Sequence, residues 1–159
     1  MKNRSLLFGV IIVTLFVLSA CGNNKSEHAQ HRAENGDLQE TTASLKDLPS
    51  FLDDLPKQIQ TAYQTAADVK DVLPWIPCYC GCGESAGHKS NLNCFIKEIK
   101  EDGSVIWDDH GTRCGVCMET AMITSQMVNE KKSTKEIRTY IDQLYQTGYA
   151  KPTPTPFPA

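Results

Sequence analysis

Six cysteines between positions 78 and 117 are the residues of this chain whose types and spacing best suit chemistry. The stretch PCYCGCG, from Pro77 to Gly83, places three of them at every second position, and CGVC supplies a Cys-x-x-Cys pair farther along. Alternate residues of an extended segment point to one side and glycine permits a sharp turn, so the three sulfurs of the first group can meet at one point. The predicted cluster contains Cys78, Cys80, Cys82, Cys94, Cys114 and Cys117.

Two histidines lie near these cysteines in the sequence. His110 stands four residues before Cys114 and directly follows Asp108 and Asp109, whose carboxylates can fix the tautomer of an imidazole ligand. His110 is therefore the predicted nitrogen ligand, and His88 is the weaker candidate. A surface histidine in an aspartate-rich turn is the alternative interpretation of His110.

Three interpretations of the cysteines stay open. Thiolates joined by an imidazole suit a soft metal ion, with four ligands closing a tetrahedral zinc site and fewer sulfurs favouring copper(I). Six cysteines can instead pair as three disulfides in an exported protein. Cys114 and Cys117 can also take part in thiol–disulfide exchange, because a helix N-terminus favours the thiolate. We favour the metal site, with copper or zinc as the cofactor, and predict no catalytic residue, because no nucleophile with a base and an oxyanion site is evident.

The start of the chain has the pattern of a lipoprotein export signal. Lys2 and Arg4 precede an apolar run that is shorter than the roughly 20 residues of a membrane span, and the ending LSAC resembles a bacterial lipobox. We therefore expect a signal peptide at residues 1–20 and a diacylglyceryl group on Cys21. Two acyl chains are enough to anchor a protein stably in a membrane. The predicted location is the extracytoplasmic face of the cell membrane, with the membrane as a partner through the lipid anchor.

Composition divides the remaining chain into three parts. Residues 21–45 are polar and almost free of large apolar side chains, so they are expected to form a flexible tether. The proline-alternating residues 151–159 are expected to form an extended, unpacked tail. One folded domain remains at residues 46–150. The formal net charge of −3 and the pI of about 5.8 give no basic surface for nucleic acid.

Helical periodicity dominates this domain. Apolar residues recur at helical spacing from Leu55 to Val69, from Leu92 to Ile99 and from Cys114 to about Glu130. A fourth helix is predicted to begin at Ser133, because STKE has the pattern of a capping box. Residues 104–107, with the sequence SVIW, suggest one extended run, which by itself does not make a sheet. The predicted fold is therefore all-α, a small domain of about four helices with cysteine-rich loops.

Three pieces of the sequence, PCYCGC, GHKSNLNC and CGVC, resemble a bacterial family of lipoproteins that contain the PCYCGC motif. The resemblance extends from about Leu73 to Tyr149 and implies a membrane-tethered extracellular protein, but it implies no reaction. The later segment STKEIRTYIDQLYQTGY is similar to the small helical domain of cytochrome c maturation thiol reductases, whose paired cysteines occur earlier in the domain. That similarity implies a fold of a few helices, and partner proteins that handle metals or assemble cytochromes.

Overall fold

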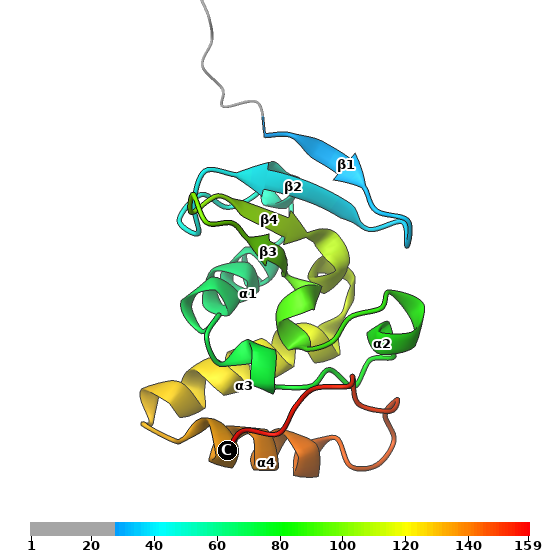
Figure 1. Ribbon diagram of the computed structural model, residues 1–159, viewed down its shortest axis with the longest axis vertical. Helices are drawn as coiled ribbons and strands as arrows, with labels where there is room; N and C mark the ends of the chain where they lie inside the picture. Colours follow the sequence, from blue (N-terminus) through cyan, green and yellow to red (C-terminus); the bar gives the residue numbers. More distant parts are fainter. Residues whose placement is uncertain (1–27) are drawn as a thin grey trace, which may run out of the picture.

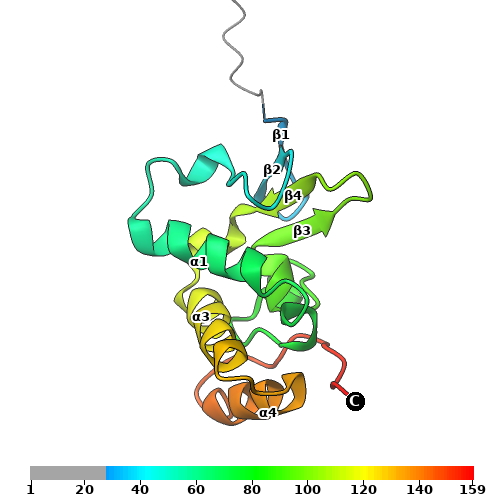
Figure 2. The ribbon, with the colours of Figure 1, turned by 90° about the vertical axis from the view of Figure 1, so that its left-hand side faces the viewer.

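The protein is described by a computed structural model in which residues 28–159 are placed. A sheet lies at one end, α1 and α3 follow beneath it, and α4 lies at the opposite end (Figure 1). The view turned by 90° shows the same order of layers (Figure 2). The predicted signal peptide and Cys21 lie outside the described residues. Within residues 28–159, no helix is both long enough and apolar enough to cross a membrane.

The prediction of an all-α fold is wrong, because four antiparallel strands form a sheet beside the helices. The strands are β1 (Gln30–Arg32), β2 (Leu38–Thr42), β3 (Ile96–Ile99) and β4 (Val105–Asp108). Their order across the sheet is β1-β2-β4-β3, so β4 pairs with a strand that lies more than sixty positions earlier in the chain as well as with its neighbour β3. The fold is therefore mixed α and β.

The predicted helix between Leu92 and Ile99 is one source of this error. Its first part is a short 3-10 helix, and its second part is strand β3. Few residues separate β3 from β4, and Gly103 adopts a left-handed backbone (φ 85°) in the connecting turn, as a tight hairpin requires. Val105 and Trp107, at alternate positions of β4, are both buried. Pairing with β4 therefore makes residues 96–99 a strand, although four apolar residues between Leu92 and Ile99 have helical spacing.

The predicted tether is also corrected by the structure, because β1 and β2 form a hairpin within residues 30–42. This hairpin has few large apolar side chains, but its buried polar groups are hydrogen-bonded. The Glu40 carboxylate accepts hydrogen bonds from the Ser50 amide (2.5 Å) and the Gln30 side chain (2.7 Å), and Thr42 Oγ1 accepts one from Trp107 Nε1 (2.8 Å). Pairing with the rest of the sheet thus orders a segment whose composition alone predicted disorder.

The helices agree better with the sequence. The α-helices are α1 (Lys57–Asp68), α2 (Cys82–Ser85), α3 (Gly115–Asn129) and α4 (Thr134–Leu144). Short 3-10 helices are η1 (Ser50–Leu52), η2 (Leu73–Trp75), η3 (Asn91–Cys94) and η4 (Asp109–Arg113). The predicted capping box of the last helix is confirmed: Ser133 Oγ accepts a hydrogen bond from the Glu136 amide, and the Glu136 carboxylate accepts one from the Ser133 amide.

Two cores hold these elements together. The larger one joins the sheet to α1 and α3, with Tyr63 of α1 packed edge-on against Phe95 and donating a hydrogen bond to the Asp108 carbonyl (2.6 Å). Four of the six clustered cysteines are part of this larger core. The smaller core lies between α4 and the stretch before α2, and its buried members are Ile76, Tyr79, Ile137, Ile141 and Tyr145.

The C-terminal residues 151–159 have no regular secondary structure, but they pack against the domain rather than forming the expected unpacked tail. Thr153 is buried, and the guanidinium of Arg138 donates a hydrogen bond to the Pro156 carbonyl (3.0 Å) while lying 5.1 Å from the centre of the Phe157 ring. The ordered unit therefore extends beyond the predicted domain of residues 46–150 at both ends.

Ile141→Ala is expected to lower the free energy of unfolding by about 2–5 kcal/mol, because it leaves a cavity in the smaller core. Ser133→Ala should lower it by about 1 kcal/mol through loss of the cap. Urea unfolding followed by circular dichroism measures both changes.

Tyr140→Ala is the matched control, because Tyr140 precedes Ile141 on α4 and its side chain is 46% exposed. We expect this control to change the free energy of unfolding by less than about 0.5 kcal/mol. An equally small change for Ile141→Ala would show that α4 is not packed on the domain.

Candidate metal centre

The cysteine motif is an extended segment that passes between the two cores. Cys78 and Cys82 are buried in the larger core, whereas Tyr79 is buried in the smaller one and donates a hydrogen bond to Asp142 of α4 (2.7 Å). Alternation along the strand-like backbone thus separates the sulfurs from the aromatic ring, as the spacing predicted. Gly81 has a left-handed backbone (φ 91°) that ends the extended segment and starts α2 at Cys82.

The C-terminal segment fixes the backbone of this motif. Thr153 Oγ1 accepts a hydrogen bond from the Cys78 amide (3.0 Å), and the Thr153 amide donates one to the Cys78 carbonyl (3.0 Å). The Ala150 amide donates a further bond to the Tyr79 carbonyl (3.1 Å). Both backbone polar groups of the buried Cys78 are therefore satisfied by a segment about seventy-five residues away in the sequence.

The sulfur atoms converge on Cys117, in the first turn of α3. Cys117 Sγ lies 3.1 Å from Cys78 Sγ, 3.5 Å from Cys80 Sγ and 3.2 Å from Cys94 Sγ. Cys78 and Cys80 are 3.3 Å apart, and Cys82 Sγ is 3.7 Å from Cys94 Sγ. The sulfurs of Cys78, Cys80, Cys82 and Cys117 all lie within 4.8 Å of one another, close enough to bind a metal ion.

The remaining two cysteines come from the segments that flank this group. Cys94 ends η3, and Gly111 of η4 allows these segments to touch, because a Cβ at Gly111 would lie 2.8 Å from the Cys94 carbonyl and the Phe95 ring. Cys114 is the N-cap of α3, where its sulfur accepts a hydrogen bond from the Cys117 amide (3.4 Å). Cys80 and Cys114 are half-buried, whereas the other four cysteines are buried.

His110 reaches the cluster from η4, and Asp37 orients it. Its Nδ1 lies 3.2 Å from Asp37 Oδ2, and a hydrogen bond with Cys80, supported by the nearby Asp37 carboxylate, raises the pKa of the imidazole. Asp37 follows the turn between β1 and β2 and is itself held by Asn35 Nδ2 (2.7 Å) and by the guanidinium of Arg113. A carboxylate therefore does fix the imidazole, but it is Asp37 rather than the predicted neighbours in the sequence.

His88, the weaker candidate, also belongs to this centre. It is 7% exposed, with Nδ1 3.6 Å from Cys94 Sγ and Nε2 3.9 Å from Asp37 Oδ2. Its ring packs edge-on against that of His110, with ring centres 4.7 Å apart. Burial, together with the nearby His110, lowers the pKa of His88 to about 4, so its imidazole is neutral near pH 7 and has a lone pair to offer a metal.

Contacts among the sulfurs also divide the protons unevenly. Hydrogen bonds, the strongest from Cys117, lower the pKa of Cys78 to about 4, and hydrogen bonds from Cys114 and Cys117 lower the pKa of Cys80. The same contacts with Cys114, Cys78 and Cys80 raise the pKa of Cys117, which acts as a proton donor to its neighbours. The group therefore carries thiolate at neutral pH, which is the form that binds metals.

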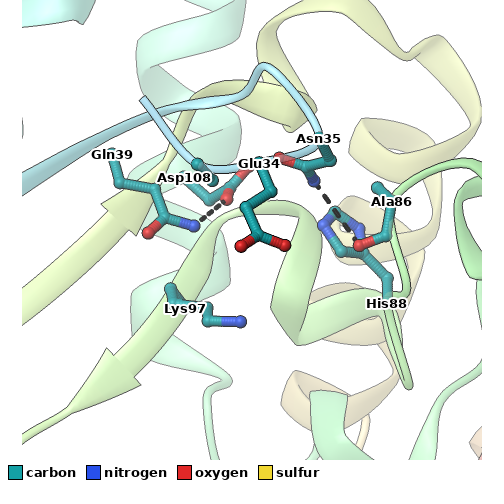
Figure 3. A pocket seen from close by; sticks show the side chains of 8 residues that line it. Glu34, Asn35, Gln39, Ala86, His88, Lys97 and Asp108 are labelled. Atoms are coloured by element: carbon teal, nitrogen blue, oxygen red, sulfur yellow. Dashed lines mark hydrogen bonds between the residues drawn. The ribbon is translucent and has the colours of Figure 1, made fainter. Parts of the chain in front are cut away.

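A cavity of about 370 Å³ opens beside His88. His88, Asp108, Glu34 and Lys97 are among the residues that line it, and Figure 3 shows their side chains. Gln39 donates a hydrogen bond to Asp108 at its wall (2.8 Å), as the dashed line shows. Since His88 also contacts Cys94, this cavity leads from solvent to the imidazole side of the centre.

The structure therefore assembles every sequence-predicted ligand, with Cys114 at the edge of the group. His88, which the sequence ranked below His110, joins the same group of ligand atoms and lies midway between Cys82 and Cys94 in the chain, whereas Asp37 was not predicted. An available signal for Asp37 was the Asn-Gly pair that precedes it, which is typical of a hairpin turn. Chemically, six thiols offer soft ligands and two imidazoles offer nitrogen ligands that suit zinc and copper.

Comparison with known proteins identifies the family of the chain. A family described as "Protein of unknown function with PCYCGC motif" matches residues 10–158 of the chain. No curated protein and no solved structure shows significant similarity. The resemblance inferred from the motif is thereby confirmed over nearly the whole chain, but the match supplies no activity.

Thr153→Val is predicted to loosen the motif, because it removes the oxygen that accepts from the buried Cys78 amide. An unpaired buried amide costs about 1–3 kcal/mol, so the free energy of unfolding should fall by that amount. Hydrogen exchange of the Cys78 amide, measured by NMR, should become faster.

Thr139→Val is the control, because Thr139 is exposed on α4 and its hydroxyl donates only to a carbonyl one turn earlier, that of Lys135. If the Cys78 amide exchanges its hydrogen at the same rate in the two variants, the C-terminal segment does not hold the motif in place.

Proposed function

The chain belongs to the PCYCGC motif family, whose function is unknown, and we propose from its site that it binds a soft metal ion, copper(I) or zinc, through clustered thiolates. The protein serves as a membrane-anchored metal-binding lipoprotein in this proposal. No catalytic step is assigned to it. Proteins that deliver or accept the metal, including those that assemble cytochromes, are the proposed partners.

One observation carries the proposal: Cys117 Sγ contacts three other sulfurs at 3.1–3.5 Å. Disulfides join sulfurs in separate pairs, whereas metal ligands surround one point. In a tetrahedral zinc site with bonds of 2.3 Å, the sulfurs lie about 3.8 Å apart. The observed sulfurs are closer than this by less than about 1 Å, so small side-chain rotations admit an ion.

The chemistry of the donors supports a soft ion. Thiolate sulfur prefers copper(I) and zinc over calcium or magnesium, which take oxygen ligands. Four of the six cysteines are fully buried, and protein around them excludes competing water. The half-buried Cys80 and Cys114 leave one side of the cluster accessible for exchange of the metal with a partner.

The proposed location follows from the first residues of the chain. The LSAC sequence before residue 22 supports cleavage ahead of Cys21 and lipid attachment to its sulfur. Only a few residues separate Cys21 from the first described residue, His28, so the anchor would hold the domain close to the outer face of the membrane. A metal centre at that position meets ions before they enter the cell.

Thiol–disulfide exchange by Cys114 and Cys117 is less well supported. The hydrogen bond with Cys117 lowers the pKa of Cys114, but the contact with Cys80 and burial outweigh it, so the pKa of Cys114 is raised. An attacking cysteine needs its thiolate, and here the thiolate character falls on Cys78 and Cys80 instead. A structural scaffold of three disulfides is the other alternative, and the experiment below separates it from metal binding.

Zinc(II) or copper(I), added to the reduced full chain in detergent, is predicted to raise its melting temperature, because an ion that binds only the folded state stabilises it. Cys80→Ser and Cys117→Ser should each remove most of this rise. The rise should shrink as the pH falls, because bound thiols must lose their protons. Differential scanning calorimetry at several pH values measures it.

The control is Cys21→Ser, which removes a sulfur from outside the cluster and should keep the full rise. Mass spectrometry of protein isolated without reductant tests the alternatives. Three disulfides, together with no uptake of either ion after reduction, would replace the metal proposal with the scaffold. One labile disulfide between Cys114 and Cys117 would favour thiol exchange.

Cys21→Ser is also predicted to release the protein from membranes or to leave its signal uncleaved. Fractionation of cells and labelling with a fatty-acid analogue measure the two effects. Cys80→Ser is the matched control, because it changes a cysteine of the domain and should stay labelled and membrane-bound. Continued lipid labelling of the Cys21→Ser chain would contradict the anchor.

A further inference from the structure

We propose that the centre holds two metal ions joined by the thiolate of Cys82, an inference that rests on the metal-binding function above. Cys82 belongs to two groups of ligand atoms. One group is sulfur alone, formed with Cys78, Cys80 and Cys117, and the other is formed with His88 and His110. Within each group, all ligand atoms lie within 4.8 Å of one another.

The number of donors argues for two ions. Zinc in structural sites takes four ligands, whereas six cysteines and two histidines gather here. One ion in the sulfur group would leave His88 and His110 without a role, although His88 is 7% exposed and packed into the protein. Two ions that share one thiolate use seven of these eight donors and leave only Cys114, at the edge of the group, without a metal.

We assign Cys94 to the second group as its fourth ligand, although its sulfur also lies 3.2 Å from Cys117 Sγ of the first group. Its sulfur lies 3.7 Å from Cys82 Sγ and 3.6 Å from His88 Nδ1, and the side chain is fully buried. Cys82, Cys94, His88 and His110 then supply two sulfurs and two nitrogens, a common tetrahedral set for zinc. Cys78, Cys80 and Cys117, with the shared Cys82, supply four sulfurs to the other ion.

The surroundings of His110 are those of a metal-bound imidazole. Its Nδ1 lies 3.2 Å from Asp37, so the other ring nitrogen remains for an ion shared with Cys82, which belongs to the same ligand group. Asp37 is held in turn by Asn35 and Arg113, so the carboxylate cannot rotate away from the ring without losing both contacts. A surface histidine would need no such support.

A shared thiolate also allows two cations to lie close together. The negative sulfur of Cys82 would lie between the ions and reduce their repulsion, while each ion keeps three ligands of its own. Each ion needs its cysteine ligands as thiolates and its histidine ligands as neutral imidazoles, so binding at either group releases protons. The cavity lined by His88 provides a route to the second ion.

The test counts zinc(II) ions on the reduced full chain in detergent by native mass spectrometry. We expect two ions on the wild-type chain and one on the double variant His88→Gln, His110→Gln, which keeps all six cysteines of the domain. His31→Gln is the matched control, because His31 is exposed on β1, and it should keep two ions.

The outcomes separate this proposal from the proposed function. A wild-type chain that takes up one zinc ion, with no change in the double variant, overturns the two-ion centre but leaves metal binding intact. A chain that binds neither zinc(II) nor copper(I) overturns both. If the double variant does not fold, the wild-type zinc titration decides: two successive binding steps support the proposal, and one step overturns it.

Asp37→Asn provides a milder variant, because the asparagine keeps the shape but not the charge that orients His110. Loss of such a supporting group typically costs 10–100-fold in metal affinity, so the second binding step should weaken by about that factor while the first is unchanged. Equal weakening of both steps would show that Asp37 supports the fold rather than the second ion.

Discussion

The convergence of several sulfurs on Cys117 is the constraint on which the rest of the structure depends. Thiols pack well in an apolar core. Sulfurs that lie 3.1–3.5 Å apart, however, bring their lone pairs and protons into contact, and the resulting repulsion is absent from a core of methyl groups. The first turn of α3 therefore needs firm positioning. It receives that from α1 on one side and α4 on the other, while η3 and η4 bring Cys94 and His110 to it.

The motif itself joins the two cores, because its alternation assigns each side chain to a different one. Cys78 and Cys82 complete the larger core, and Tyr79 completes the smaller core against α4. The C-terminal segment then satisfies the backbone of Cys78. Few positions in the motif can change independently, because moving one sulfur moves the tyrosine that fixes the last helix. Packing alone therefore restricts which residues this six-residue motif can contain, whether or not it takes part in a reaction.

The sequence allowed prediction of the helices and the sulfur cluster, but not the sheet. Amphipathic spacing is a local property, so it located α1, α3 and α4, and the capping box located the start of α4 at Ser133. Strand β2 pairs with β4 more than sixty positions away, and its stability comes from buried hydrogen bonds such as that between Thr42 and Trp107. A local pattern of apolar residues cannot predict a contact between segments so far apart in the sequence. The contact of Asp37 with His110 could not be predicted for the same reason, because it joins residues 73 positions apart.

The missed sheet matters for the imidazole side of the centre, since Asp37 and His110 adjoin strands of the sheet, whereas His88 lies between α2 and η3. Asp37 follows the β1–β2 turn and His110 follows β4, whereas Cys117 belongs to α3. The sulfur group thus combines the extended motif with the first turn of α3, the sheet positions His110 and Asp37, and Cys82 belongs to both ligand groups. In the two-ion proposal, each ion links ligands from separate segments, so the free energy of metal binding contributes to the docking of the sheet against the helices. The metal-free domain would then be weakest at this junction, beside the cavity that His88 lines.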